Sequence, residues 1–132
     1  MIQRYLFCGT PDFAARHLEA LIQAFPESDL GVITRPDAPK GRGQHLGTSP
    51  VKDLAKTKGL EVWTPTQKSD LIVCVDAFKP TLIIVVAYGM IFPKQLTDTY
   101  YCINIHGSIL PYYRGASPIQ ASLLNNDLET GI

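Results

Sequence analysis

Residues 82–86 read Leu-Ile-Ile-Val-Val, an apolar run of five residues in which four are β-branched. Side chains on a strand alternate between the two faces of a sheet, so a strand without any polar position must be covered on both faces. Such strands occur mainly at the centre of parallel sheets, because the helices that connect parallel strands pack on either side. The run therefore predicts an α/β protein with a central parallel strand.

Segments with strand-like and helix-like patterns alternate along the rest of the chain. Short apolar runs predict further strands at residues 5–8, 30–34, 61–63 and 100–106. Helical spacing of apolar residues, with Thr10 and Ser49 as N-caps, predicts helices at residues 10–25, 49–58, 70–78 and 117–124. Residues 129–132 resemble the approach to one more strand, and residues 35–49 are too rich in Gly and Pro to predict regular structure. This order is typical of a doubly wound, mostly parallel, Rossmann-like sheet, incomplete at its C-terminal end.

Composition limits the class of protein further. A chain of 132 residues with 45% apolar content can form one domain around one core, and its basic and acidic residues balance at twelve each. The three cysteines, Cys8, Cys74 and Cys102, lie in apolar runs without metal-binding spacing, which predicts buried, reduced thiols in a cytoplasmic protein. The same spacing predicts no metal site. No apolar run reaches the roughly 18 residues that a membrane span needs, and residues 1–4 lead directly into the first predicted strand, so we expect no membrane partner and no targeting segment.

The turn after the first predicted strand argues against one common cofactor. Residues 9–14 read Gly-Thr-Pro-Asp-Phe-Ala, with one glycine where the nicotinamide-binding fingerprint has three. We therefore expect no dinucleotide site of that kind.

Asn104 and His106 are the strongest candidate site residues. They stand two positions apart at the end of a predicted strand, so they point to the same face while Ile103 and Ile105 fill the other. Gly107 follows and turns the chain away at the carboxyl end of the strand, where open α/β sheets place ligand crevices. The pattern predicts an active site with an amide donor and a titratable imidazole, whereas the same two residues without their flanking motif would more often be structural.

Four segments of the chain resemble one family and keep its order. They are residues 7–14, the basic loop with its Ser-Pro-Val-Lys run in residues 35–52, residues 85–91, and the Asn-x-His-x-Ser-x-Leu-Pro motif with its continuation at residues 104–119. On these segments the chain is similar to the methionyl-tRNA formyltransferase family, whose members formylate aminoacylated initiator tRNA with 10-formyltetrahydrofolate. The resemblance implies that residues 1–132 are part of the N-terminal catalytic domain, that the C-terminal domain is absent, and that the full-length enzyme is a monomer acting in translation initiation.

The chemistry of formyl transfer explains the two site residues. Attack of an amine on the formyl carbon creates a negatively charged oxygen, which the Asn104 amide can stabilise. The amine must lose a proton and the folate nitrogen must leave, so a group that titrates near neutrality, His106, is useful. The resemblance also implies a third catalytic residue, an aspartate on the strand after Ile132, and Asp127 is not assigned that role. Without this aspartate we expect the chain alone to have little or no activity.

Two loops are implied to bind the folate. A glycine at the end of the strand at residues 82–86 lets a flat heterocycle approach the backbone. The folate-binding residues implied by the resemblance are Tyr88, Gly89 and Met90 in that loop and Ser108, Ile109, Leu110 and Pro111 in the other. Packing in the core is an alternative role for the side chains of Tyr88 and Met90.

Basic residues gather between residues 35 and 58, where six Lys and Arg stand against two Asp. A local excess of this kind in a neutral chain favours a polyanionic partner at one edge of the molecule. Arg42 lies between Gly41 and Gly43 and could enter an RNA groove, as the resemblance implies, and Arg35 and Lys40 are the other expected tRNA contacts. Lys56 and Lys58 fit an ordinary solvated helix face.

Two other classes of function stay open on the sequence alone. A small-molecule formyltransferase or formyl hydrolase would share the Asn-His motif but should lack the basic, glycine-rich loop. A noncatalytic folate-binding or RNA-binding module would fit the missing aspartate. We favour a fragment of a longer enzyme, because residues 129–132 stop in the middle of an expected element.

Overall fold

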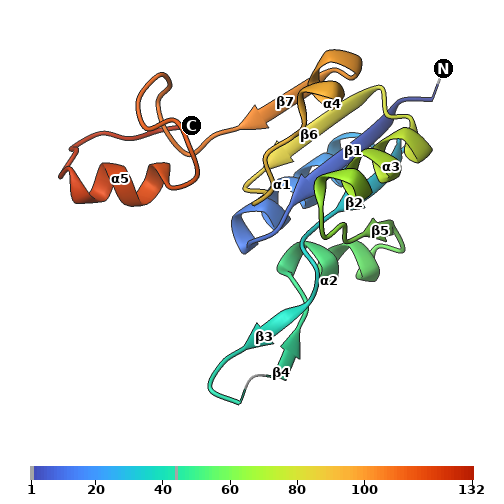
Figure 1. Cartoon of the computed structure of the whole chain (residues 1–132), viewed down its shortest axis with the longest axis horizontal. Coiled ribbons are helices and arrows are strands. Elements are labelled where there is room, and N and C mark those ends of the chain that lie inside the picture. The colour runs from blue at the N-terminus through green and yellow to red at the C-terminus, as the bar shows by residue number, and fades with distance from the viewer. Residues whose placement is uncertain (1, 44) are drawn as a thin grey trace.

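The computed structural model describes residues 2–43 and 45–132, and a five-stranded sheet forms its centre (Figure 1). The strand order is β5 (Glu61–Trp63), β2 (Asp29–Ile33), β1 (Arg4–Gly9), β6 (Leu82–Val86) and β7 (Cys102–Ile105). Each pair of neighbours is parallel. The predicted buried strand is confirmed, since β6 pairs with β1 on one side and with β7 on the other.

Helices cover both faces of the sheet. On one face, α1 (Asp12–Ala24) and α2 (Pro50–Thr57) bury apolar side chains against β1, β2 and β6. On the other face, α3 (Lys68–Phe78) and α4 (Lys94–Thr99) do the same. The doubly wound α/β fold is therefore confirmed.

Strand β6 contributes side chains to both cores, which is why its sequence carries no polar position. Ile84 and Val86 belong to the core under α1 and α2, whereas Ile83 belongs to the core under α3 and α4. Val85 packs against that second core as well. The alternation of side chains along a strand thus requires an apolar residue at every position of β6.

The fifth helix, α5 (Pro118–Leu124), confirms the helix expected there but lies apart from the sheet, beyond the end of β7 (Figure 1). Leu123, Leu124 and Leu128 are exposed. Residues 129–132 form no strand, contrary to the expectation. A strand needs a neighbouring strand for its backbone hydrogen bonds, whereas Gly131 lies against the side chain of Ile109 rather than along a sheet edge.

The prediction of irregular structure throughout residues 35–49 was wrong. Two short strands, β3 (Ala38–Lys40) and β4 (His45–Gly47), pair in antiparallel fashion and form a hairpin that projects from the body (Figure 1). Each strand has three residues, and most of their side chains are exposed. Strands that bury neither face leave no apolar alternation in the sequence, so periodicity could not reveal them.

One of the two predicted helix caps is confirmed. The Ser49 hydroxyl accepts a hydrogen bond from the Lys52 backbone N–H at 3.0 Å, as an N-cap does. Thr10 is not the cap of α1: the N-cap residue is Pro11, which is extended (ψ 178°), and the helix begins at Asp12. The strand expected at residues 100–106 is shorter than predicted, because the Tyr100 backbone N–H bonds to Leu96 and ends α4 instead.

The cysteines are only partly as expected. All three are free thiols, but only Cys8 is buried, while Cys74 and Cys102 are half-buried. Burial raises the pKa of Cys8, and the neighbouring Cys102 raises it further. None of the helices in the described part of the chain is long and apolar enough to cross a membrane.

Candidate active site

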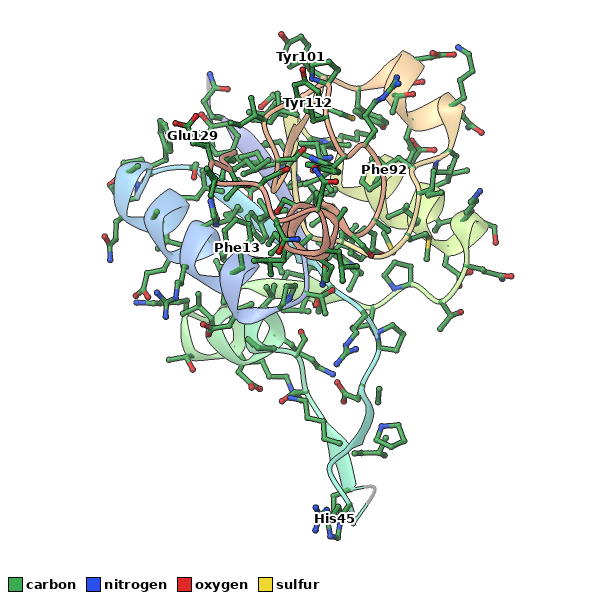
Figure 2. All side chains as sticks on the ribbon, turned by 90° about the vertical axis from the view of Figure 1, so that its left-hand side faces the viewer. Phe13, His45, Phe92, Tyr101, Tyr112 and Glu129 are labelled. Carbon is green, nitrogen blue, oxygen red and sulfur yellow. The ribbon has the colours of Figure 1, made fainter. Side chains whose placement is uncertain are left out.

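A cavity of about 890 Å³ opens at the carboxyl ends of β6 and β7. Its wall is formed by the loop after β6, by β7 itself, by the start of α1 at Phe13 and by the segment that leads into α5. Figure 2 places Phe13 and Phe92 on the body of the molecule, far from His45 at the end of the hairpin. Ligand crevices of open α/β sheets lie at this edge, because the connections after the strands diverge there.

Asn104 and His106 both line this cavity, as the spacing predicted. Asn104 lies beside Val85 in the parallel register of β6 and β7. Its side chain is exposed, and in the part of the chain that the structure describes no hydrogen bond engages its amide. Ile105 turns to the opposite face and packs under α1 and α2. The amide of Asn104 is therefore available to a ligand in the cavity.

The His106 ring is held on both sides. Its Nδ1 lies 2.8 Å from the Ser108 hydroxyl and its Nε2 lies 3.1 Å from the Gly115 carbonyl oxygen. The Ser108 hydroxyl in turn donates to the Tyr112 carbonyl at 2.7 Å. These three contacts fix the orientation of the imidazole at the cavity wall.

The same contacts constrain the protons on the ring. A hydroxyl has one hydrogen, so a Ser108 that donates to Tyr112 can only accept from Nδ1 of His106. The Gly115 carbonyl is an acceptor too, and it requires a hydrogen on Nε2. All three contacts coexist only when both ring nitrogens carry a hydrogen. A ring with one hydrogen can keep only two of the three contacts. The hydrogens on the two ring nitrogens therefore decide which of these contacts His106 makes.

The loop after β6 contributes Tyr88, Gly89 and Met90 to the cavity wall. Ala87 has a positive φ of 47°, which turns the chain sharply at the end of the strand. The side chain of Tyr88 is half-buried and packs edge-on against Phe92 at 6.3 Å between ring centres. Burial raises the pKa of the Tyr88 hydroxyl, with smaller contributions from Cys8 and Cys74. The ring is therefore part of the core beside the cavity.

The second predicted folate loop lies differently. The Ser108 side chain is 2% exposed and its hydroxyl is occupied by His106 and Tyr112, so it has no donor left for a ligand. Ile109, Leu110 and Pro111 are exposed and are not among the residues that line the cavity. The structure does not bring these four side chains together with Tyr88, Gly89 and Met90 in one pocket.

Asp127 is engaged away from His106. Its carboxylate accepts hydrogen bonds from the Tyr113 hydroxyl and, at 2.6 Å, from the Asn125 amide. The hydrogen bond from Tyr113, and secondarily that from Asn125, lowers the pKa of the Asp127 carboxyl. Among residues 2–43 and 45–132, no group of three or more His, Cys, Asp or Glu side chains is placed to hold a metal ion.

The three predicted tRNA contacts lie in or next to the hairpin, away from the cavity. Arg42 is exposed at the hairpin tip between Gly41 and Gly43, and Arg35 is exposed where the chain leaves β2. The ammonium of Lys40 instead donates to the Thr48 carbonyl across the base of the hairpin.

Sequence reasoning missed Ser108 and Gly115 as partners of His106. The sequence could have indicated Ser108, because a hydroxyl two residues after a site histidine can reach the ring in a turn. The sequence could not have indicated Gly115, since it contributes a backbone carbonyl that the loop brings close to the ring.

The cavity lies at the carboxyl edge of the parallel sheet, which is where open α/β proteins as a class place their ligand crevices. A family model described as formyl transferase matches residues 3–132. The chain belongs to the formyl transferase family.

A relative of known name is the methionyl-tRNA formyltransferase of Desulfotalea psychrophila, which is 47% identical over 133 aligned residues. The match covers 98% of this chain and 41% of the relative, so the chain spans about two fifths of that protein's length.

Solved structures support the fold. The glycinamide ribonucleotide transformylase 1 of Geobacillus kaustophilus superposes with a TM-score of 0.74 at 15% identity, covering 99% of this chain and 72% of that one. A formyltetrahydrofolate deformylase from Pseudomonas syringae pv. tomato has a TM-score of 0.68 at 17% identity, and the match covers 95% of this chain and 42% of that one. At these identities the likeness concerns the architecture alone.

Proposed function

We propose that residues 1–132 are part of the N-terminal catalytic domain of an enzyme that transfers the formyl group of 10-formyltetrahydrofolate to the amino group of methionyl-initiator tRNA. The observation that carries the formyl-transfer part of the proposal is the pair Asn104 and His106 at the wall of one cavity. The name of the Desulfotalea relative supports the choice of substrate. A cytoplasmic setting suits the three free cysteines of the described chain.

In this mechanism the amine nitrogen attacks the formyl carbon and forms the new C–N bond, and the carbonyl oxygen becomes negatively charged. The amide N–H of Asn104 donates a hydrogen bond to that oxygen. When the intermediate collapses, the bond between the carbon and the folate nitrogen breaks. His106 takes the proton of the attacking amine and delivers a proton to the departing folate nitrogen. We infer that the backbone of Tyr88, Gly89 and Met90 contacts the folate ring, because these residues line the same cavity.

Substrate assays on the full-length enzyme, as its gene encodes it, test the proposal. With 10-formyltetrahydrofolate as donor, we expect formylation of charged initiator tRNA and at most about 1% of that rate with glycinamide ribonucleotide or with water as acceptor. Preferred transfer to glycinamide ribonucleotide would support a small-molecule formyltransferase. Release of formate without an acceptor would support a hydrolase, and folate binding without turnover a noncatalytic module.

Ser108 should act as a positioning residue for His106. Ser108→Ala removes the contact to Nδ1, so we expect kcat to fall by about tenfold or more while folate affinity changes less than about twofold. Ser122→Ala is the matched control, because Ser122 is also a buried serine that binds a backbone carbonyl but lies in α5 without contact to His106. An equal loss of kcat in both variants would show that Ser108 matters only for stability.

A further inference from the structure

The β3–β4 hairpin has little apolar attachment to the body of the protein. None of the described residues between 35 and 48 belongs to either core cluster, and Leu46 is exposed. Among the residues that the structure describes, strands β3 and β4 pair only with each other. The direction of the hairpin must therefore be set by the polar contacts at its base.

The first of these contacts joins the two ends of the hairpin segment. The hydroxyls of Thr34, directly after β2, and Ser49, directly before α2, lie 2.7 Å apart and are 0% and 1% exposed. The Ser49 oxygen also accepts the Lys52 backbone N–H at 3.0 Å. One buried hydroxyl thus caps α2 and ties the returning chain to the end of β2.

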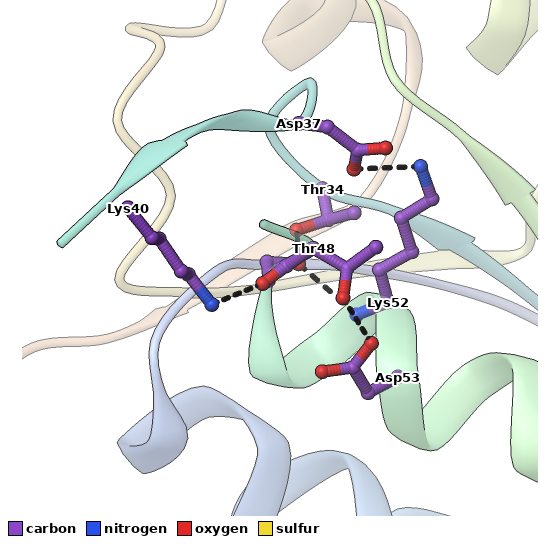
Figure 3. A network of polar contacts seen from close by, with 7 residues as sticks. Thr34, Asp37, Lys40, Thr48, Lys52 and Asp53 are labelled. Atoms are coloured by element: carbon purple, nitrogen blue, oxygen red, sulfur yellow. Dashed lines mark hydrogen bonds and ion pairs between the residues drawn. The ribbon is translucent and has the colours of Figure 1, made fainter. Parts of the chain in front are cut away.

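Two further contacts fasten both legs of the hairpin to α2 (Figure 3). On the outgoing leg, the Asp37 carboxylate pairs with the Lys52 ammonium at 2.7 Å. On the returning leg, the Thr48 hydroxyl donates to the Asp53 carboxylate. Lys40 joins the legs to each other through its bond to the Thr48 carbonyl.

The Asp37–Lys52 pair is the most enclosed ion pair in the described chain, with the Lys52 side chain 16% exposed. A partly enclosed pair is less screened by salt and water than a surface pair. Because its ammonium is occupied by Asp37, Lys52 is a poor candidate for a phosphate contact. Its ammonium instead holds the outgoing leg of the hairpin against α2 through Asp37.

We propose that Asp37 and Lys52 are positioning residues for RNA recognition: their ion pair fixes the direction in which the hairpin presents Arg42 to the tRNA. This inference rests on the proposed function, which supplies the RNA partner. A hairpin released from α2 must be ordered again when RNA binds, and this cost weakens binding without touching the reacting atoms. The variants should therefore change the KM for tRNA and leave kcat unchanged.

The test compares Asp37→Asn, Lys52→Met and the reversed pair Asp37→Lys with Lys52→Asp in the full-length enzyme. We expect each single variant to raise the KM for charged initiator tRNA about fivefold, with kcat and folate affinity within about twofold of the parent. The reversed pair should recover most of the loss. Amide hydrogen exchange in β3 and β4, measured without RNA, should accelerate in the single variants and slow again in the reversed pair.

Lys56→Met is the matched control, since Lys56 is an exposed lysine on the same helix and loses the same charge. If Lys56→Met raised the KM as much as Lys52→Met, or if Asp37→Asn lowered it, general attraction to RNA would explain the data and positioning would be refuted. Failure of the reversed pair to recover would also refute it. A parent enzyme that does not formylate tRNA would instead overturn the proposed function, while the hydrogen-exchange comparison would still report on the hairpin.

Discussion

Replacing Asn104 by alanine in the full-length enzyme should lower kcat by about 100- to 1,000-fold, the typical effect of removing one hydrogen-bond donor to an oxyanion. Asn104 lines the cavity, and its amide has no hydrogen-bond partner in the described chain, so its removal breaks no internal hydrogen bond. His106→Ala should lower kcat by at least about 100-fold, because proton transfer to and from the reacting nitrogens is lost. Steady-state kinetics at saturating folate and tRNA measure both effects.

Folate affinity separates catalysis from binding in these variants. We expect it to change less than about twofold, because both side chains are assigned to the transition state and we propose that the folate contacts come from the loop after β6. Thermal unfolding should be unchanged for Asn104→Ala, since its side chain is exposed. A variant that keeps nearly full kcat, or that loses activity only through weaker folate binding, would contradict its catalytic assignment.

The parts of the fold that bury apolar surface could be predicted from the sequence. Leu82–Val86 lies inside a parallel sheet, the arrangement that most often covers both faces of a strand without polar positions. The positions of Asn104 and His106 at the carboxyl edge followed from the alternation of side chains and from the turn at Gly107. In both cases a simple periodicity carried the information.

Apart from the Ser49 cap, the parts that rest on polar contacts could not be predicted. The hairpin strands Ala38–Lys40 and His45–Gly47 bury almost nothing, and α4 (Lys94–Thr99) buries one side chain, Leu96, in six residues. The pairing of Asp37 with Lys52 joins residues fifteen positions apart through a loop whose path the sequence does not specify. Hydrogen-bond partners brought together by tertiary structure, such as His106 and the Gly115 carbonyl, leave no periodic trace.

Arg42→Ala in the full-length enzyme should separate tRNA recognition from formyl transfer. Arg42 is exposed at the tip of the hairpin, and Gly41 beside it has a positive φ of 68° with open space around it, so the guanidinium can approach phosphates or base edges. We expect kcat/KM for charged initiator tRNA to fall by about 10- to 100-fold, the range of a bidentate arginine contact, while folate affinity stays unchanged. Arg42→Lys should recover only part of the loss, because an ammonium supplies the charge without the planar pair of donors. Arg16→Ala, which removes an exposed arginine from α1, controls for the loss of charge. Equal activity on tRNA with and without Arg42 would remove the main structural reason for assigning an RNA substrate. A formyltransferase that acts on a small molecule would then be the favoured interpretation.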